Sequence, residues 1–192
     1  MTKAQIIRDL ISQSPFIAFG SEDVRKLSQR FQSKRNIYVR FAYQWKDEHG
    51  RQRKALSLAL KRTLKRLFDE VVGAFPRSKH RLNYASLRAQ AGRPVLHKIV
   101  LDIVSADLLF FDLTYSNPNV LFELGIAYTT NRDLLLLLRE GVADTVPSDL
   151  SGLTYCRYNT ADGFSLDSYA EKDIKSMMRK VVSHKMGPRA TR

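Results

Sequence analysis

Several features that often reveal a protein's chemistry are scarce in this chain of 192 residues. It has one cysteine, Cys156, which excludes an intrachain disulfide framework and a cysteine-rich metal site. Its 4 histidines, at positions 49, 80, 97 and 184, show no metal-ligand spacing, so we expect no metal. The GxGxxG and P-loop motifs are also missing, so conventional dinucleotide or nucleoside triphosphate binding is unsupported and we expect no cofactor.

Long hydrophobic runs are missing as well. The longest apolar run is far too short to span a bilayer, and the start MTKAQIIRDL is too polar for a secretory signal. We therefore expect no membrane partner and a cytoplasmic location. A hydrophobic content of 44% nevertheless supports a full core, in which Cys156 is expected to be a small buried residue.

The segment from Ala106 to Leu138 is the most informative part of the chain. Asp107 to Leu113 is a continuous apolar run of strand length, which is typical of a strand covered on both faces. Pro118 suits the first position of a helix that runs to about Thr130, and Asn117 or Ser116 can cap it. A second buried strand, Leu134 to Leu138, follows. Strand, helix and strand at this spacing predict a parallel right-handed crossover.

The whole pattern predicts an α/β fold, with a flavodoxin-like, doubly wound parallel sheet of about five strands in the order 2-1-3-4-5. The predicted strands are 37–43, 82–85, 107–113, 133–138 and 154–158. The predicted helices of this sheet are 55–72, 94–105, 118–130 and 167–183. Residues 36–185 form the expected domain, 186–192 a disordered basic tail, and 1–35 an N-terminal α/β addition containing a helix at 4–11, a short strand at 16–19 and a helix from Ser21.

Glu123 is the first candidate functional residue. Val120, Leu124 and Ala127 form the core-facing stripe of the predicted helix, and Glu123 lies on the edge of that stripe. A charge there is costly unless it is paired or used. Asn119 lies one turn earlier, near backbone N–H groups that favour an anion. Glu123 is therefore either a working carboxylate with a perturbed pKa or a glutamate satisfied by a buried hydrogen bond or by Arg132.

Three short motifs carry a family resemblance: Asp112-Leu113-Thr114, Asn117-Pro118-Asn119-Val120 and Phe122-Glu123-Leu124-Gly125. They resemble the core of the nucleoside 2-deoxyribosyltransferase-like superfamily, including its TIR-like nucleotide-binding branch. The stretch 146–158 is similar to the last loop and strand of that branch. The resemblance implies that Glu123 attacks the anomeric carbon of a nucleoside. The resulting glycosyl ester is then resolved by water or by a second base.

The resemblance also implies the other residues of the site. The family's first strand ends in a small residue, a bulky residue, often proline, and an aromatic residue that lines the base pocket. Ala42-Tyr43-Gln44-Trp45 resembles this, with Gln44 in place of proline. Tyr43 and Trp45 are then either base-stacking residues or ordinary core residues. We expect Asp112, Asn117, Asn119 and Glu123 to converge on one cleft at the carboxyl end of the sheet, with Thr114 nearby and Tyr43 or Trp45 opposite.

A second carboxylate is harder to place. Glycosyl transfer needs a group that handles the proton of the leaving base. Enzymes of the family often carry an aspartate on the helix before the central strand, but that position is Ile99 here. Asp102 is the nearest acid, almost one turn away. Asp112 is the better candidate because it ends the strand beside the expected cleft, where it can bind ribose hydroxyls.

The net charge of +13 is unevenly distributed. Residues 25–98 contain 20 Lys/Arg against 4 Asp/Glu, whereas residues 99–171 contain 3 against 11. This asymmetry has two interpretations. The basic half binds a polyanion such as nucleic acid, or it is a solvated basic face that meets an acidic protein. The candidate residues are Arg51, Arg53, Lys54, Lys61, Arg62, Lys65 and Arg66.

Three functions remain open. The first is an N-glycosidase or deoxyribosyltransferase acting on a nucleoside, a nucleotide or NAD. The second is a non-catalytic nucleotide sensor of TIR-like type, and the third is a nucleic-acid-associated module using the basic half. The missing aligned aspartate favours the sensor over a fast transferase, whereas Glu123 favours the enzyme over the third class. We also expect a homo-oligomer.

Overall fold

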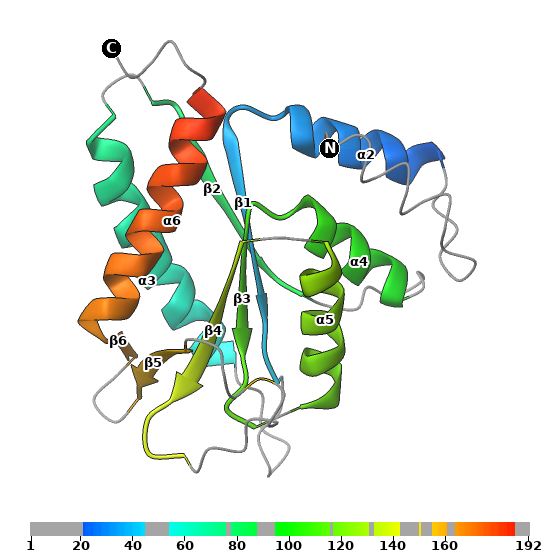
Figure 1. Ribbon diagram of the computed structural model, residues 1–192. Coiled ribbons are helices and arrows are strands. Elements are labelled where there is room, and N and C mark those ends of the chain that lie inside the picture. Colours follow the sequence, from blue (N-terminus) through cyan, green and yellow to red (C-terminus); the bar gives the residue numbers. More distant parts are fainter. Residues whose placement is uncertain are drawn as a thin grey trace.

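A computed structural model describes residues 21–44, 54–75, 78–87, 95–115, 117–130, 133–142, 150, 155–160 and 164–186. Within these ranges the chain forms an α/β fold around one sheet of six strands, with helices on both faces (Figure 1). The strands are β1 (Asn36–Ala42), β2 (Arg81–Ser86), β3 (Leu108–Asp112), β4 (Leu134–Arg139), β5 (Tyr155–Asn159) and β6 (Ser165–Leu166). The helices are α2 (Ser21–Gln32), α3 (Lys54–Gly73), α4 (Val95–Ser105), α5 (Pro118–Thr129) and α6 (Ser168–Met186).

The strand order is β2-β1-β3-β4-β5-β6. The first five strands pair in parallel; in the central pair, Leu109 lies opposite Leu134 and Asp112 opposite Leu137. The predicted parallel α/β class is therefore confirmed, but the sheet has six strands in the order 2-1-3-4-5-6 where about five in the order 2-1-3-4-5 were predicted. A sixth strand, β6, pairs antiparallel with β5 at the edge. Its two residues are too few to show an alternating pattern in the sequence.

The two faces of the sheet pack against different helices. Because side chains alternate along a strand, Leu108 and Phe110 of β3 face α3 and α6, while Leu109 and Phe111 face α5. All five residues of β3 are buried, as the continuous apolar run predicted. Cys156 of β5 is 3% exposed, which confirms that it is a core residue.

Local sequence explains where the helices lie. In α3 the buried residues recur at helical spacing and turn a single face toward the sheet; they are Ser57, Leu60, Leu64, Leu67, Phe68 and Val71. Pro118 occupies the start of α5, and the side chain of Asn117 accepts a hydrogen bond from the backbone N–H of Asn119. After β4 the chain turns at Gly141, whose φ of 73° lies in the left-handed region that favours glycine.

The helix predicted from Ser21 packs against the sheet domain. Leu27 of α2 lies in an apolar cluster with Val100, Leu101 and Val104 of α4. Arg30 adds hydrogen bonds to Asp102 and Ser105 on the same helix. Residues 21–32 therefore form an additional layer over α4 (Figure 1).

Some predictions fall outside the described residues. These are the helix at 4–11, the strand at 16–19, Trp45, Arg51, Arg53, Arg132 and the tail after Met186, which is itself the last residue of α6. Among the described residues, no helix combines the length and apolar character needed to cross a bilayer.

Lys185 connects α6 to the amino-terminal edge of the sheet. Its Nζ lies 2.7 Å from Asp107 Oδ2, and both side chains are 9% exposed. The ammonium also donates to the carbonyl oxygens of Asn36 and Ser33, at 2.6 and 3.3 Å. Asp107 in turn accepts from the backbone N–H of Tyr38 at 2.8 Å, so one ion pair links α6, β1 and the start of β3.

Lys185→Ala tests this connection. Removing one member of a buried ion pair leaves the other charge uncompensated, so we expect a loss of about 3 kcal/mol in the free energy of unfolding. Chemical denaturation measures it. Lys172→Ala, at an exposed position of the same helix, is the control and should change stability by less than about 0.5 kcal/mol. Equal losses in the two variants would contradict a special role for Lys185.

Candidate functional site

Helix α5 brings the candidate site residues to the carboxyl-terminal edge of the sheet. It begins at the end toward which the parallel strands point (Figure 1). Asn117 is the N-cap and is partly buried, whereas Asn119 is exposed on the first turn. Ligands of open α/β sheets bind beyond this edge. In α5, Pro118 has no N–H and the N–H of Asn119 already donates to the Asn117 side chain, so the first turn offers the exposed side-chain amide of Asn119. Asn119 is therefore placed to contact such a ligand.

Glu123 is a buried acid without a counter-charge. It shares the buried side of α5 with Val120, Leu124 and Ala127, and it retains 9% exposure. Within the described part of the chain its carboxylate has no hydrogen-bond or ion-pair partner. Burial raises the pKa of Glu123 from 4.5 to about 7. The sequence left the direction of this shift open, because the positive helix end opposes desolvation; desolvation is the dominant effect.

Asp112 belongs to a buried polar cluster with Thr114 and Tyr158. Its Oδ1 accepts hydrogen bonds from the backbone N–H of Thr114, at 3.1 Å, and from the Thr114 hydroxyl. The Tyr158 hydroxyl oxygen lies 3.3 Å from each oxygen of the Asp112 carboxylate. All three residues are buried, with exposures of 3%, 1% and 1% for Asp112, Thr114 and Tyr158. The existing hydrogen bonds of Asp112 therefore compete with any contact to ribose hydroxyls.

The two candidate catalytic carboxylates lie on different faces of the sheet. Asp112 follows the alternation of Leu108 and Phe110, and its partner Tyr158 belongs to the core beneath α3 and α6. Glu123 packs with the opposite core, which contains Phe111 and Leu113. Asp112 is the last residue of β3, and Glu123 is in the second turn of the helix that follows. No described hydrogen bond joins the two acids. The convergence of Asp112 and Glu123 on one cleft therefore stays a prediction.

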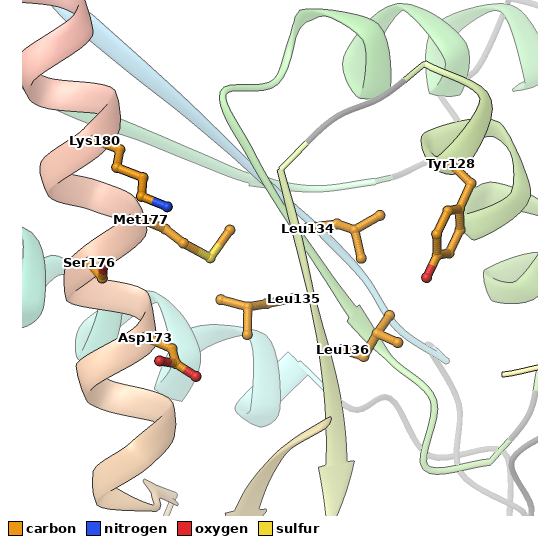
Figure 2. Close-up of a pocket in the computed structure, with 8 residues that line it drawn as sticks. All are labelled: Tyr128, Leu134, Leu135, Leu136, Asp173, Ser176, Met177 and Lys180. Atoms are coloured by element: carbon orange, nitrogen blue, oxygen red, sulfur yellow. The ribbon is translucent and has the colours of Figure 1, made fainter. Parts of the chain in front are cut away.

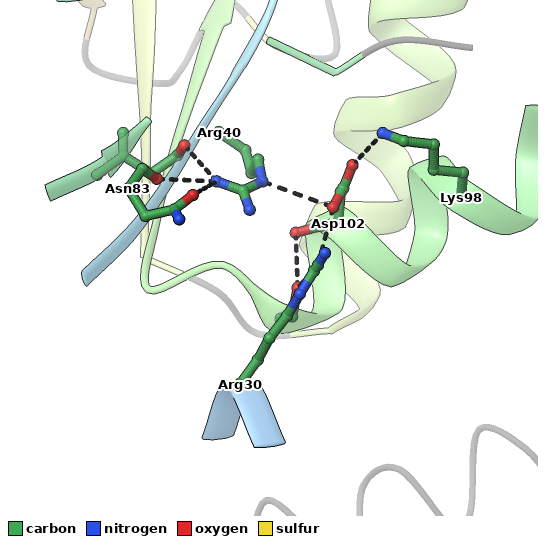
Figure 3. Close-up of polar contacts among 7 residues, drawn as sticks. Arg30, Arg40, Asn83, Lys98 and Asp102 are labelled. Carbon is green, nitrogen blue, oxygen red and sulfur yellow. Dashed lines mark hydrogen bonds and ion pairs between the residues drawn. The ribbon is translucent and has the colours of Figure 1, made fainter. Parts of the chain in front are cut away.

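Asp102, the alternative second carboxylate, is held by three cations (Figure 3). Arg30 and Lys98 donate to it at 2.8 and 2.6 Å, and Arg40 Nε lies 3.6 Å away. Desolvation opposes its ionisation, but the hydrogen bond from Lys98, the charge of Arg40 and the hydrogen bond from Arg30 together lower the pKa of Asp102. A carboxylate held ionised in this way is a poor proton donor for a leaving base. Its role here is to join α2, α4 and β1.

Tyr43 packs as a core residue. It is 4% exposed, and its ring stacks on Phe41 with the centroids 4.8 Å apart. Both rings belong to the core beneath α3 and α6, on the face away from Glu123. Of the two interpretations left open by the sequence, the structure therefore favours packing for Tyr43. Trp45 lies outside the described residues.

Two residues at this edge were missed by the sequence interpretation. Tyr158 was included only as the end of a strand, and Arg139 was not considered. The backbone N–H of Arg139 donates to the Thr114 hydroxyl at 3.0 Å, and its guanidinium lies 5.6 Å from the centre of the Tyr115 ring. Arg139 is the last residue of β4, as Asp112 is the last residue of β3. A polar residue at the carboxyl end of a parallel strand is a candidate for ligand contact, and this criterion would have identified Arg139 as well.

A cavity of about 430 Å³ lies elsewhere, between β4 and α6 (Figure 2). It is lined by Tyr128, Leu134, Leu135, Leu136, Asp173, Ser176, Met177 and Lys180. The three leucines form the first half of β4, at the end of the sheet opposite the expected ligand edge. No candidate site residue from the described part of the chain lines this cavity. It therefore gives no support to the Glu123 site.

Metal binding has no structural support in the described ranges. They contain no group of three or more His, Cys, Asp or Glu side chains arranged to hold a metal ion. The site as described consists of one unpaired carboxylate, the amide of Asn119 and the first turn of α5.

Comparison with other proteins adds no assignment. No family model matches the chain, and no curated protein matches it either. The likeness to the nucleoside 2-deoxyribosyltransferase-like superfamily therefore stays a prediction from the three motifs around Asp112, Asn117 and Glu123.

The raised pKa of Glu123 has a measurable effect on stability. Its folded-state pKa of about 7 lies above the ordinary value of 4.5, so the contribution of the neutral acid is complete below pH 4.5 and is lost as the pH rises through 7. Glu123→Gln cannot titrate. Relative to this variant, we expect the native protein to lose about 3 kcal/mol of unfolding free energy between about pH 4 and pH 8.

Denaturation curves measured across this pH range give the difference between the two proteins. Glu140→Gln, at an exposed position after β4, is the matched control and should follow the native curve. Parallel curves for Glu123→Gln and the native protein would show that Glu123 titrates with an ordinary pKa.

Proposed function

We propose that this protein cleaves or transfers the N-glycosidic bond of a nucleoside, a nucleotide or NAD, with Glu123 as the nucleophile. The observation that carries the proposal is a buried carboxylate, without a described partner, in the second turn of a helix that starts at the ligand edge of the sheet. Burying such a group is unfavourable, and an unfavourable buried charge is typical of a functional site.

The proposed reaction has two steps. A Glu123 carboxylate oxygen attacks the anomeric carbon, the bond from that carbon to the base nitrogen breaks, and its electron pair leaves with the base. Protonation of the leaving base by solvent or by another group completes the first step. Water, or the nitrogen of a second base, then attacks the same carbon and releases Glu123 as a carboxylate. The incoming group loses its proton in this step.

The surroundings of Glu123 suit this role. A pKa of about 7 leaves about half of the carboxylate ionised at neutral pH, and the ionised half is weakly solvated. The exposed side-chain amide of Asn119 offers a donor for sugar hydroxyls or a phosphate one turn away. The expected ligand is accordingly a nucleoside or nucleotide bound over the start of α5. The proposal further includes a flavodoxin-like fold, a cytoplasmic location and assembly into a homo-oligomer.

A non-catalytic nucleotide sensor is the second candidate, and a specific observation favours it. Asp112 is hydrogen-bonded to Thr114 and Tyr158, and Asp102 is paired with Arg30, Arg40 and Lys98. Neither acid is then available to protonate a leaving base. A protein with this arrangement would bind the ligand and release the base slowly or not at all.

Base release distinguishes the two candidates. The full chain is incubated with a panel of nucleosides, nucleotides and NAD, and free base is measured by chromatography. We expect release from at least one compound, and a loss of at least about 1,000-fold in Glu123→Ala with ligand binding retained. Glu140→Gln serves again as the control with native turnover. Binding of a nucleotide without turnover by the native protein would identify a sensor, and undiminished turnover in Glu123→Ala would remove Glu123 from the mechanism.

The pH dependence of the rate gives an independent check. A nucleophilic Glu123 must be ionised, so the rate at limiting substrate should rise with pH through about 7, the pKa of Glu123, and level off above it. A rate that falls over the same range would instead indicate that Glu123 acts as a proton donor.

A further inference from the structure

Helices α3 and α6 form a layer whose charge differs from that of the opposite layer. They pack side by side on one face of the sheet (Figure 1). Each carries five Lys/Arg and two Asp/Glu residues. Helices α2, α4 and α5 on the other face together carry four residues of each sign. The outer surface of α3 and α6, called here the α3–α6 face, is therefore the more basic of the two helical layers among the described residues.

Ion pairs neutralise only part of this face. Lys65 pairs with Asp69, Arg66 with Glu70 and Glu171, and Lys175 with Glu70. Lys185 is turned inward to Asp107. Six further cations on these helices have no acidic partner among the described residues: Lys54, Lys61, Arg62, Lys172, Arg179 and Lys180. All six are exposed, so the unneutralised charge is available to a partner. Lys180, which also lines the cavity between β4 and α6, lies at the β4 side of this face (Figure 2).

The face also carries an aromatic ring that α3 alone does not provide. Tyr169, in the first turn of α6, is 79% exposed. Lys172 and Arg179 follow it at helical spacing, so these three side chains share the solvent-facing ridge of α6. The ion pair between Arg66 and Glu171 places this end of α6 directly beside α3, on which Arg62 is exposed one turn earlier. The exposed ring of Tyr169 therefore lies one turn from the exposed Lys172 on the same helix.

We propose that the α3–α6 face binds single-stranded nucleic acid, with the six cations along the phosphate backbone and Tyr169 stacked on a base. Cations beside an exposed aromatic ring are the usual combination for binding a single strand without sequence preference. A membrane surface fits less well, because among the described residues Leu58 and Tyr169 are the large hydrophobic side chains exposed on this layer.

Salt dependence and matched variants test the electrostatic part. A fluorescent single-stranded oligonucleotide is titrated with the full chain between 50 and 200 mM salt, and we expect a slope of about −4 in log K against log[salt] for six contacts. The double variant Arg62→Ala/Lys172→Ala removes two contacts, so affinity should fall about 25-fold at 0.1 M salt. Arg25→Ala/Lys26→Ala removes the same charge from α2 on the opposite layer and should bind almost as the native chain.

A second pair of variants tests stacking. Tyr169→Ala should weaken binding about tenfold and leave the salt slope unchanged. Tyr128→Ala removes the 45% exposed tyrosine of α5, on the opposite layer, and should have no effect. Thermal unfolding of all four variants checks that each remains folded.

Three results would overturn the proposal. One is the absence of binding at 50 mM salt, and another is an equal loss in the α3–α6 and α2 double variants, which would reflect net charge alone. The third is tighter binding to vesicles of anionic lipid or to an acidic polypeptide than to the oligonucleotide, which would assign this face to a different partner.

Discussion

Burial of β3 on both faces is the constraint on which the remaining structure depends. Its five residues are buried between β1 and β4, so both sides of the strand require helices. One layer is supplied by α3 and α6, and the other by α4 and α5. Since each parallel crossover returns the chain to the same end of the sheet, the loops after β3 and β4 both emerge at the carboxyl-terminal edge. That geometry places Asp112, Arg139 and the start of α5 at a common edge.

Four acids of the described residues have largely buried side chains, and they fall into three groups. Asp102 and Asp107, on the amino-terminal side of β3, are paired with cations from α2, α4, α6 and β1. Asp112 is satisfied by hydroxyl and backbone donors. Glu123 alone among these four lacks a described partner, and burial raises its pKa to about 7. Because buried acids elsewhere in the fold are paired, the unpaired one is the best candidate for chemistry.

Much of the fold could be predicted because its signals are local. The five predicted strands match β1 to β5 within one or two residues, and the start of α5 follows from Asn117 and Pro118. The placement of Glu123 on the edge of the apolar stripe also holds, since it is buried beside Val120 and Leu124. The antiparallel β6 was missed because its two residues carry no periodicity. The hydrogen bonds of Tyr158 were missed because Asp112 lies 46 residues away in the chain.

By itself, the sequence determined which segments are strands and helices, which faces are apolar, and that one glutamate would lie at the edge of a buried stripe. These properties depend on the 2.0 and 3.6 residue periods of the backbone, which act over a few neighbouring residues. Only the tertiary structure decided that Asp112 is bonded to Tyr158, that Asp102 is held by Arg30 and Arg40, and that the ridges of α3 and α6 share one face. Such pairings join residues distant in the chain, because they depend on how the two helical layers close over the sheet.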